Sequence, residues 1–471
     1  MFIKNDIFRQ YDIRGIVGKD LDGEIACKIG RAFSLHLKDV KPAANKVTVG
    51  RDVRLSSKEL SDGIIKGILS EGFDVCDIGE CPTPLQYFSL YHLDVDGGIM
   101  VTGSHNPPEY NGLKLSFGKE TIHGEAIQEI RRIIRNSKAG NTSKKGILTS
   151  YKIIPAYREY MLKQFSYLEG TEFRRLKVVI DAGNGTAGLV APDIISNMGC
   201  DLIPLYCEPD GHFPNHHPDP TVLEYIRDLI NLTKTSGAHF GVGYDGDADR
   251  IGVVDSEGNV IWGDQIMIIL SRYLLKDNPG AKIIGDVKCS QTMFDDIKKH
   301  GGTPIMWKTG HSLVKQKMRD EKALLAGEFS GHIFIAERYF GYDDAIYTTL
   351  RLVEIMKKSG KDIKDLLSDV PRMFFTPEIR VDCAEDKKKK VVEKVVRQFL
   401  DYKERGGSPY PIRDINTIDG VRVVFEKGWG LVRVSNTQPV IVMRFEAMDQ
   451  ESLKNYQSFM EREIQAAGDG R

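Results

Sequence analysis

The sequence predicts an α/β protein: three similar α/β domains with mixed or parallel sheets, followed by a smaller α+β domain. Two observations predict this organisation. A strand–helix–glycine–strand pattern occurs three times, and the chain after residue 370 shows a different order of elements. The length of 471 residues is typical of three or four domains.

The repeated pattern begins with a short β-branched run. In the first copy, Lys46–Asp52 leads through a helical stretch to Gly72 and a second run, Phe73–Ile78. The second copy begins at Lys177–Asp181 and the third at Lys282–Lys288. Because a helix between two strands usually crosses over to a parallel neighbour, each copy predicts a βαβ unit.

The expected order of strands and helices differs in the C-terminal part of the chain. A basic amphipathic helix is expected over Lys387–Phe399, with an apolar stripe spaced for one face. The remaining expected elements are strands near Glu378–Cys383, Gly420–Phe425, Gly430–Val434 and Pro439–Ala447, and a last helix near Glu451–Ala466. These predict a mostly antiparallel sheet with helices on it, and domain boundaries near residues 150, 255 and 370.

Composition excludes several classes of protein. The formal net charge is −1, so the overall field favours neither nucleic acid nor an anionic membrane. The seven cysteines show no metal-binding or C-x-x-C spacing, which is typical of thiols in a reducing compartment. No apolar leader is visible, and the most apolar stretch, Ile266–Leu275, is too short to span a bilayer. We expect a cytoplasmic enzyme without nucleic-acid or membrane partners; the oligomeric state stays open.

The first chemical motif is TGSHNPP at 102–108, after the apolar run Gly98–Val101. Glycine and two prolines predict a tight loop at a strand end, where α/β sheets place their sites. We expect Ser104 and His105 to be catalytic, since Ser104 can act as a nucleophile or a phosphoryl carrier beside an imidazole. The alternative is an ordinary turn with a capping serine.

The second motif is DGDADR at 245–250. Asp245, Asp247 and Asp249 can converge on one hard cation, and three acids leave coordination positions open, as a catalytic Mg²⁺ requires. An EF-hand is excluded because position 6 of the loop is Arg250 and position 12 is Ser256. A guanidinium beside the metal is suited to a phosphoryl oxygen. A solvated acidic turn is the alternative.

Two further loops carry polar residues. In GEFSGH at 327–332, Glu328 and Ser330 can point the same way toward sugar hydroxyls, and His332 can exchange a proton near neutral pH. In RVSNTQP at 433–439, one cation with hydroxyls, an amide and backbone N–H groups is typical of a phosphate site. A structural histidine and a polar hairpin turn are the alternatives.

A glycine-rich turn at 183–188 also fits G-x-G-x-x-G after a strand, with Glu208 further on. It raises the alternative of an NAD-linked oxidoreductase. Asp181 and Ala182 separate the strand from the first glycine, and the carboxylate would lie near a pyrophosphate, so a structural turn is favoured. No Walker A sequence occurs.

The four chemical loops, in this order, resemble the active-site loops of the α-D-phosphohexomutase family. The resemblance is strongest to bacterial and archaeal phosphomannomutase/phosphoglucomutase enzymes and covers the whole chain. Further matching segments are FRQYDIRG at 8–15, GRDVRLSS at 50–57, NGLK at 111–114, DAGNGTAG at 181–188 and TGHS at 309–312.

The resemblance implies that the three α/β domains and the smaller C-terminal domain surround a central cleft. It also implies roles for individual residues. Ser104 would carry the phosphate, and Asp245, Asp247 and Asp249 would hold one Mg²⁺ together with a phosphoserine oxygen. The other catalytic residues implied are Arg14, Lys114 and Arg250. The implied substrate contacts are Tyr11, Lys288, His311, Glu328, Ser330, His332, Arg433, Ser435, Asn436 and Thr437.

The implied activity is interconversion of hexose 1-phosphate and hexose 6-phosphate, of mannose, glucose or both, through a hexose 1,6-bisphosphate that also primes the enzyme. Phe329, where many relatives have Met, leaves the hexose open. The expected domains are 1–150 with the phosphoserine loop, 151–255 with the metal loop, 256–370 with the sugar-binding loop and 371–471 with the phosphate-binding loop. A non-catalytic sugar-phosphate sensor remains a further alternative.

Overall fold

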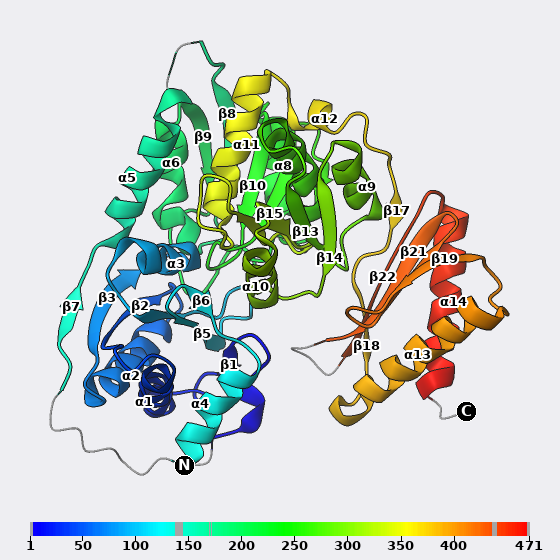
Figure 1. Ribbon diagram of the computed structural model, residues 1–471. Coiled ribbons are helices and arrows are strands. Elements are labelled where there is room, and N and C mark those ends of the chain that lie inside the picture. Colours follow the sequence, from blue (N-terminus) through cyan, green and yellow to red (C-terminus); the bar gives the residue numbers. More distant parts are fainter. Residues whose placement is uncertain (1–2, 137–144, 169, 171, 436–439, 469–471) are drawn as a thin grey trace.

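Four sheets organise the chain in the computed structural model, which describes residues 3–136, 145–168, 170, 172–435 and 440–468. Three of them are mixed and the last is antiparallel. Figure 1 shows the C-terminal unit, orange to red, standing beside the other three. The predicted fold class is confirmed.

The first sheet has the order β1-β5-β4-β2-β3-β7, with β6 paired to β5. Its strands are β1 (Ile13–Ile16), β2 (Lys46–Arg51), β3 (Asp74–Glu80), β4 (Gly97–Val101), β5 (Tyr110–Phe117), β6 (Glu120–Thr121) and β7 (Leu148–Ser150). Its helices are α1 (Gly23–Val40), α2 (Ser57–Ser70), α3 (Thr83–His92) and α4 (Glu125–Asn136). Apolar residues of α1, α2 and α4 pack on one face of the sheet, and those of α3 on the other. The parallel pairing of β2 with β3 and β4 leaves the serine loop at the carboxyl end of β4.

The second sheet has the order β12-β11-β10-β8-β9, in which β8, β9 and β10 are parallel. Its elements are α5 (Ile153–Phe165), β8 (Leu176–Asp181), α6 (Ala191–Asn197), β9 (Cys200–Leu205), α7 (Arg227–Thr235), β10 (Phe240–Tyr244), β11 (Ile251–Asp255) and β12 (Val260–Ile261). The acidic loop connects β10 to the antiparallel β11. It therefore also lies at the carboxyl end of a parallel strand.

The third sheet has the order β14-β13-β15-β16. Its elements are α8 (Gly263–Asp277), β13 (Lys282–Asp286), α9 (Gln291–Lys299), β14 (Thr303–Trp307), α10 (His311–Glu321), β15 (Leu325–Gly327), β16 (Ile333–Ile335), α11 (Ala345–Ser359) and α12 (Ile363–Leu366). The sugar-binding loop expected from the sequence is the turn between β15 and β16.

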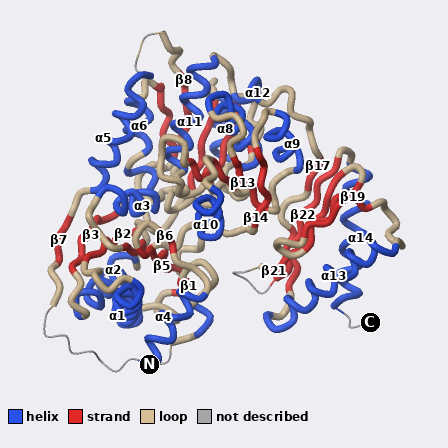
Figure 2. Tube along the Cα trace, in the orientation of Figure 1, coloured by secondary structure: helices blue, strands red, loops and turns tan. Residues whose placement is uncertain are grey.

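The C-terminal sheet is antiparallel, and two helices cover one of its faces (Figure 2). Its elements are β17 (Phe374–Phe375), β18 (Ile379–Asp382), α13 (Glu385–Arg405), β19 (Ile412–Asn416), β20 (Val421–Phe425), β21 (Gly428–Val434), β22 (Val440–Ala447) and α14 (Gln450–Gly468). Helix α13 begins two residues before the predicted Lys387, because Glu385 and Asp386 suit the positive end of the helix dipole. Its predicted stripe is buried at Val391, Val395 and Phe399.

The hydrophobic cores divide the molecule into two parts. One large core contains residues of all three first units, among them Phe88, Tyr157 and Tyr347, and the first unit has a second core on the other face of its sheet. The C-terminal sheet and its two helices have a separate core. A small cluster containing Val287 and Trp429 connects the two parts. The first three units are therefore packed as one body, with the C-terminal unit attached to it.

Candidate active site

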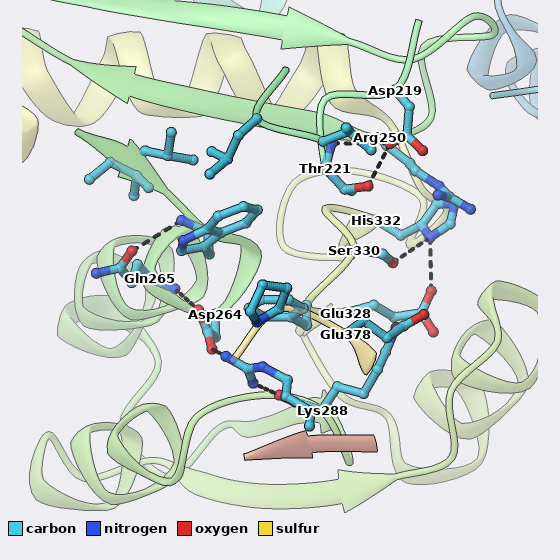
Figure 3. A pocket seen from close by; sticks show the side chains of 18 of the residues that line it. Asp219, Thr221, Arg250, Asp264, Gln265, Lys288, Glu328, Ser330, His332 and Glu378 are labelled. Carbon is cyan, nitrogen blue, oxygen red and sulfur yellow. Dashed lines mark hydrogen bonds and ion pairs between the residues drawn. The ribbon is translucent and has the colours of Figure 1, made fainter. Parts of the chain in front are cut away.

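All four units contribute to one cleft of about 1620 Å³. Every described residue that the sequence predicted as catalytic or substrate-binding lines it. They are Tyr11, Arg14, Ser104, His105, Lys114, Arg250, Lys288, His311, Glu328, Ser330, His332, Arg433 and Ser435. Asn436 and Thr437 lie outside the described residues. Figure 3 shows part of this lining.

Ser104 lies in a constrained loop after β4. It is buried and has a positive φ of 48°, which is unusual for a residue with a side chain. Its N–H donates to Thr102 Oγ1 at 2.8 Å, and its Oγ donates to Asp245 Oδ2 at 2.8 Å. His105 Nδ1 lies 3.1 Å from the same Oγ. Burial, together with the nearby Arg250, holds the pKa of His105 well below its ordinary value, so a neutral imidazole lies beside the serine hydroxyl.

Arg54 holds the serine loop in place. Its guanidinium donates to the backbone oxygens of Ser104 at 2.7 Å, Pro107 at 2.7 Å and Tyr110 at 3.0 Å, and to that of Asn106. The Arg54 side chain is completely buried. Arg54 stands in the segment GRDVRLSS, but its partners follow some fifty residues later in the chain, so the sequence alone assigns it no role.

The three aspartates of the loop between β10 and β11 form a compact cluster. All are fully buried, and one oxygen of each lies within 4.8 Å of the others. Lys114 Nζ donates to Asp247 Oδ2 at 2.7 Å and also to Asp249. Thr83 Oγ1 donates to Asp247 at 2.5 Å. Residues of the first unit thus hold the acidic loop of the second.

The charges of this cluster are suited to a divalent cation. Burial and the two neighbouring acids raise the pKa of Asp245 well above its ordinary value. Burial has the same effect on Asp249, but Lys114 and His332 outweigh it and lower the pKa of that carboxyl. Asp247 Oδ1 is buried without a hydrogen-bond partner among the described residues. An orphaned carboxylate oxygen beside two further acids is the donor set that Mg²⁺ prefers, so the residues present fit the metal.

The predicted sugar-binding loop, residues 327–332, contacts the acidic loop through His332. Its Nδ1 lies 2.8 Å from Glu328 Oε2 and 3.3 Å from Ser330 Oγ (Figure 3). Its Nε2 lies 3.3 Å from Asp249 Oδ1. Burial alone would lower the pKa of His332, but Asp249 and Glu328 raise it to about 9. The two carboxylates therefore favour the charged form of His332, against the opposing effect of Arg250, whose Nε lies 3.3 Å from His332 Nε2.

Backbone packing fixes these two loops together. Arg250 and His332 form an isolated antiparallel bridge, and Ile251 N donates to Gly331 O at 3.1 Å. Gly331 has a φ of 91°, and a Cβ there would meet Ile251 O at 2.3 Å. Only glycine permits this approach, which explains the glycine after Ser330 in the loop.

Cations of the cleft are paired with acids. Lys288 Nζ lies 3.3 Å from Glu378 Oε2, across the boundary between the third sheet and the C-terminal unit. In the N-terminal segment, Arg14 donates to Asp12 at 2.6 Å and to Asn106 of the serine loop.

Of the four residues predicted to hold a phosphate in the C-terminal unit, the structure describes Arg433 and Ser435. Arg433 Nε donates to Asp419 Oδ2 at 2.9 Å, and the backbone oxygen of Ser435 accepts from Lys388 at 2.7 Å. The basic helix α13 therefore supports the predicted phosphate loop through the buried Lys388.

Several residues of the site were missed from the sequence. Besides Arg54 and Thr83, Asp343 lies 3.7 Å from His311 Nδ1 and accepts from Lys315 at 3.0 Å. Thr83 and Asp343 lie in no motif that the sequence singles out, and Arg54 lies in a matching segment that suggests no role for it. Packing of the units, rather than local spacing, brings them to the cleft.

The glycine-rich turn at 183–188 supports the acidic loop. Thr186 N donates to Gly246 O, within that acidic loop, at 3.0 Å. Asp181 accepts from Gly183 N at 2.9 Å and pairs with His216 at 3.1 Å. This arrangement favours the structural turn over a dinucleotide site.

Four family models, the three α/β/α domains and the C-terminal domain of phosphoglucomutase/phosphomannomutase, match residues 5–141, 155–258, 262–374 and 378–463. The chain belongs to the phosphoglucomutase/phosphomannomutase family. The family predicted from the four loops is thereby confirmed.

Curated relatives of this family match over almost their whole length. A Pseudomonas aeruginosa phosphomannomutase/phosphoglucomutase is 44% identical over 462 residues, covering 98% of this chain and 96% of that protein. A Neisseria gonorrhoeae phosphoglucomutase is 41% identical over 456 residues, covering 97% and 96%.

The solved structure of a Burkholderia thailandensis member of the family superposes with a TM-score of 0.89 at 39% identity, covering 100% of this chain and 99% of that one. Across the described part of the chain, no helix combines the length and the apolar character needed to cross a membrane.

Proposed function

We propose that this chain is a phosphosugar mutase that interconverts the 1- and 6-phosphates of mannose, glucose or both. The observation that carries the proposal is the position of Ser104. Its hydroxyl lies 2.8 Å from a buried three-aspartate cluster, with Lys114 bound to the same cluster, at a cleft that all four units line. An ordinary capping serine would need none of these charges.

In the proposed reaction the phosphorylated Ser104 donates its phosphoryl group to the free 1- or 6-hydroxyl of a hexose monophosphate. The bond between phosphorus and the serine Oγ breaks and a bond to the sugar oxygen forms. The sugar hydroxyl gives its proton to a nearby base, and the released Ser104 oxygen takes up a proton, which restores the serine hydroxyl. The resulting hexose 1,6-bisphosphate turns over within the cleft, and Ser104 then accepts the other phosphoryl group. The same bisphosphate would prime unphosphorylated enzyme.

The chain's own groups supply positioning and charge. Phosphoryl transfer needs alignment and stabilisation of charge on the equatorial oxygens. Lys114 and Arg250 bring positive charge to the phosphoserine side of the cleft, and Arg14 is held at the same loop by Asn106. One Mg²⁺, held by Asp245, Asp247 and Asp249 with a phosphoserine oxygen, would supply Lewis-acid stabilisation when bound.

The sugar and its second phosphate would be held on the opposite side of the cleft. Glu328 and Ser330 are placed to accept and donate hydrogen bonds to sugar hydroxyls, with His332 charged beside them. Lys288, His311, Tyr11, Arg433 and Ser435 would hold the phosphate that is not reacting. In this proposal the four domains 1–150, 151–255, 256–370 and 371–471 each contribute one loop.

The test combines mass and turnover. Intact mass spectrometry of the purified chain should show a phosphate adduct that maps to Ser104. Ser104→Ala should lose both the adduct and mutase turnover on glucose 1-phosphate and mannose 1-phosphate while keeping the thermal midpoint of the wild type. Turnover of Ser104→Ala near the wild-type rate would refute the phosphoserine mechanism.

A further inference from the structure

The turn at Thr309–Gly310, after β14, is bonded to three parts of the molecule. Tyr11 Oη of the first unit donates to Thr309 O at 2.8 Å. Thr309 N donates to Asp419 Oδ2 of the C-terminal unit at 3.1 Å. Gly310 N donates to Glu328 Oε1, the predicted sugar ligand, at 2.5 Å. One turn therefore connects the N-terminal segment, the sugar-binding loop and the phosphate-binding unit.

Asp419 binds both the Thr309–Gly310 turn and Arg433. The oxygen that accepts from Thr309 N also accepts from Arg433 Nε at 2.9 Å. Arg433 is almost completely buried, so its guanidinium is held in one orientation at the cleft. A carboxylate on Nε orients the planar group so that its terminal nitrogens form the edge offered to an anion.

We infer that Asp419 is a positioning residue for the phosphate-binding Arg433 and couples its orientation to the Thr309–Gly310 turn. The inference rests on the proposed function, in which Arg433 holds the phosphate that is not reacting. Asp419 fixes a long side chain before the ligand arrives, which removes an entropy cost from binding. Through Thr309 it also ties the C-terminal unit to the turn that contacts Glu328.

A carboxylate beside Arg433 can also weaken phosphate binding, and the experiment distinguishes this effect from positioning. A carboxylate next to a guanidinium lowers the net positive charge that a phosphate meets, so Asp419 could act as a competitor instead. The two roles predict opposite changes in affinity when the carboxylate is removed. Positioning predicts weaker binding, whereas competition predicts tighter binding.

The experiment titrates glucose 6-phosphate into the full-length chain by calorimetry and measures KM and kcat on the same samples. Asp419→Ala should raise Kd and KM about tenfold, the size of one lost hydrogen bond to a charged group, with kcat within about twofold. Asp419→Asn keeps an acceptor and should show a smaller rise. Asp414→Asn is the matched control, because its carboxylate pairs with the exposed Lys403 at 2.9 Å outside the cleft, and it should bind as the wild type does.

A double-variant comparison tests whether Asp419 acts through Arg433. In an Arg433→Ala background, Asp419→Ala should change Kd less than about twofold, because the group it positions is gone. Tighter binding by Asp419→Ala, or an unchanged tenfold loss in the Arg433→Ala background, would overturn the inference.

The same titrations separate this inference from the proposed function. A wild-type chain that binds glucose 6-phosphate without turnover would refute the mutase proposal and leave the Asp419 comparison valid. A wild-type chain that does not bind it would overturn both.

Discussion

Replacing Arg54 with lysine should loosen the serine loop without removing any residue that would touch substrate. Arg54 donates from one rigid fork to the backbone oxygens of Ser104, Asn106, Pro107 and Tyr110. Lysine keeps the positive charge but offers a single nitrogen with three donors. The substitution therefore tests geometry at constant charge.

The size of the effect follows from the number of carbonyls left without a donor. One ammonium cannot reach four oxygens spread along the loop, so one or two of them lose their partner in a buried place. Each unsatisfied group costs about 1–3 kcal/mol. We expect the free energy of opening the loop to fall by about 2–3 kcal/mol, which corresponds to roughly 30- to 150-fold faster amide exchange if the loop opens locally.

Hydrogen exchange followed by mass spectrometry, on peptides that cover residues 102–110, measures this directly. Mutase turnover should fall by about tenfold or more, since small displacements of the reacting group reduce rates strongly. Arg51→Lys is the control: Arg51 ends β2, three residues before Arg54, and pairs with Asp77 at 3.4 Å instead of with the loop. If exchange in Arg54→Lys stays within about threefold of the wild type, the assigned role of Arg54 is wrong.

Three further changes test separate parts of the site. Gly310→Ala would put a Cβ 2.5 Å from the Tyr11 ring, at a backbone φ of 132°. The free energy of unfolding measured in urea should therefore fall by about 1–3 kcal/mol, and KM for hexose phosphate should rise. A variant with wild-type stability and wild-type KM would contradict this close packing. Thr83→Val removes the hydroxyl that donates to Asp247. Calorimetric titration with Mg²⁺ should show about tenfold weaker binding of the metal. Unchanged affinity would show that the hydroxyl does not orient the Asp247 carboxylate. Burial raises the pKa of Asp344 to about 6, above its unfolded value of 3.8, so the folded wild type binds this proton more tightly than the unfolded chain does. Its stability relative to Asp344→Asn should therefore fall by about 2–2.5 kcal/mol as pH rises from 4 to 7; a pH-independent difference in urea unfolding would contradict the raised pKa.

The parts of the site that could be predicted from the sequence are those whose geometry is local. Alternate spacing in the acidic loop predicted that Asp245, Asp247 and Asp249 could converge, and the structure brings one oxygen of each within 4.8 Å of the others. The serine loop was placed at a strand end by its glycine and prolines, and it follows β4 as expected. The roles assigned to these residues remain predictions.

The remaining parts depend on how separate units pack, which local patterns do not encode. Thr83 and its partner Asp247 are 164 residues apart in the chain, and Thr309 and Asp419 are 110 apart. Neither Thr83 nor Asp419 stands in a chemically suggestive pattern. Their importance becomes visible only when two sheets are placed side by side.

The separate core of the C-terminal unit has a consequence for how the molecule melts. One large core contains residues of all three first units, and the second core of the first unit lies on the other face of the same sheet, so these units should lose structure in a single cooperative step. The C-terminal sheet and its helices have their own core and can unfold separately. A calorimetric scan of the ligand-free chain should show two heat-absorption peaks. A bisphosphate that contacts both bodies at once would draw these peaks together, since it binds only when both are folded.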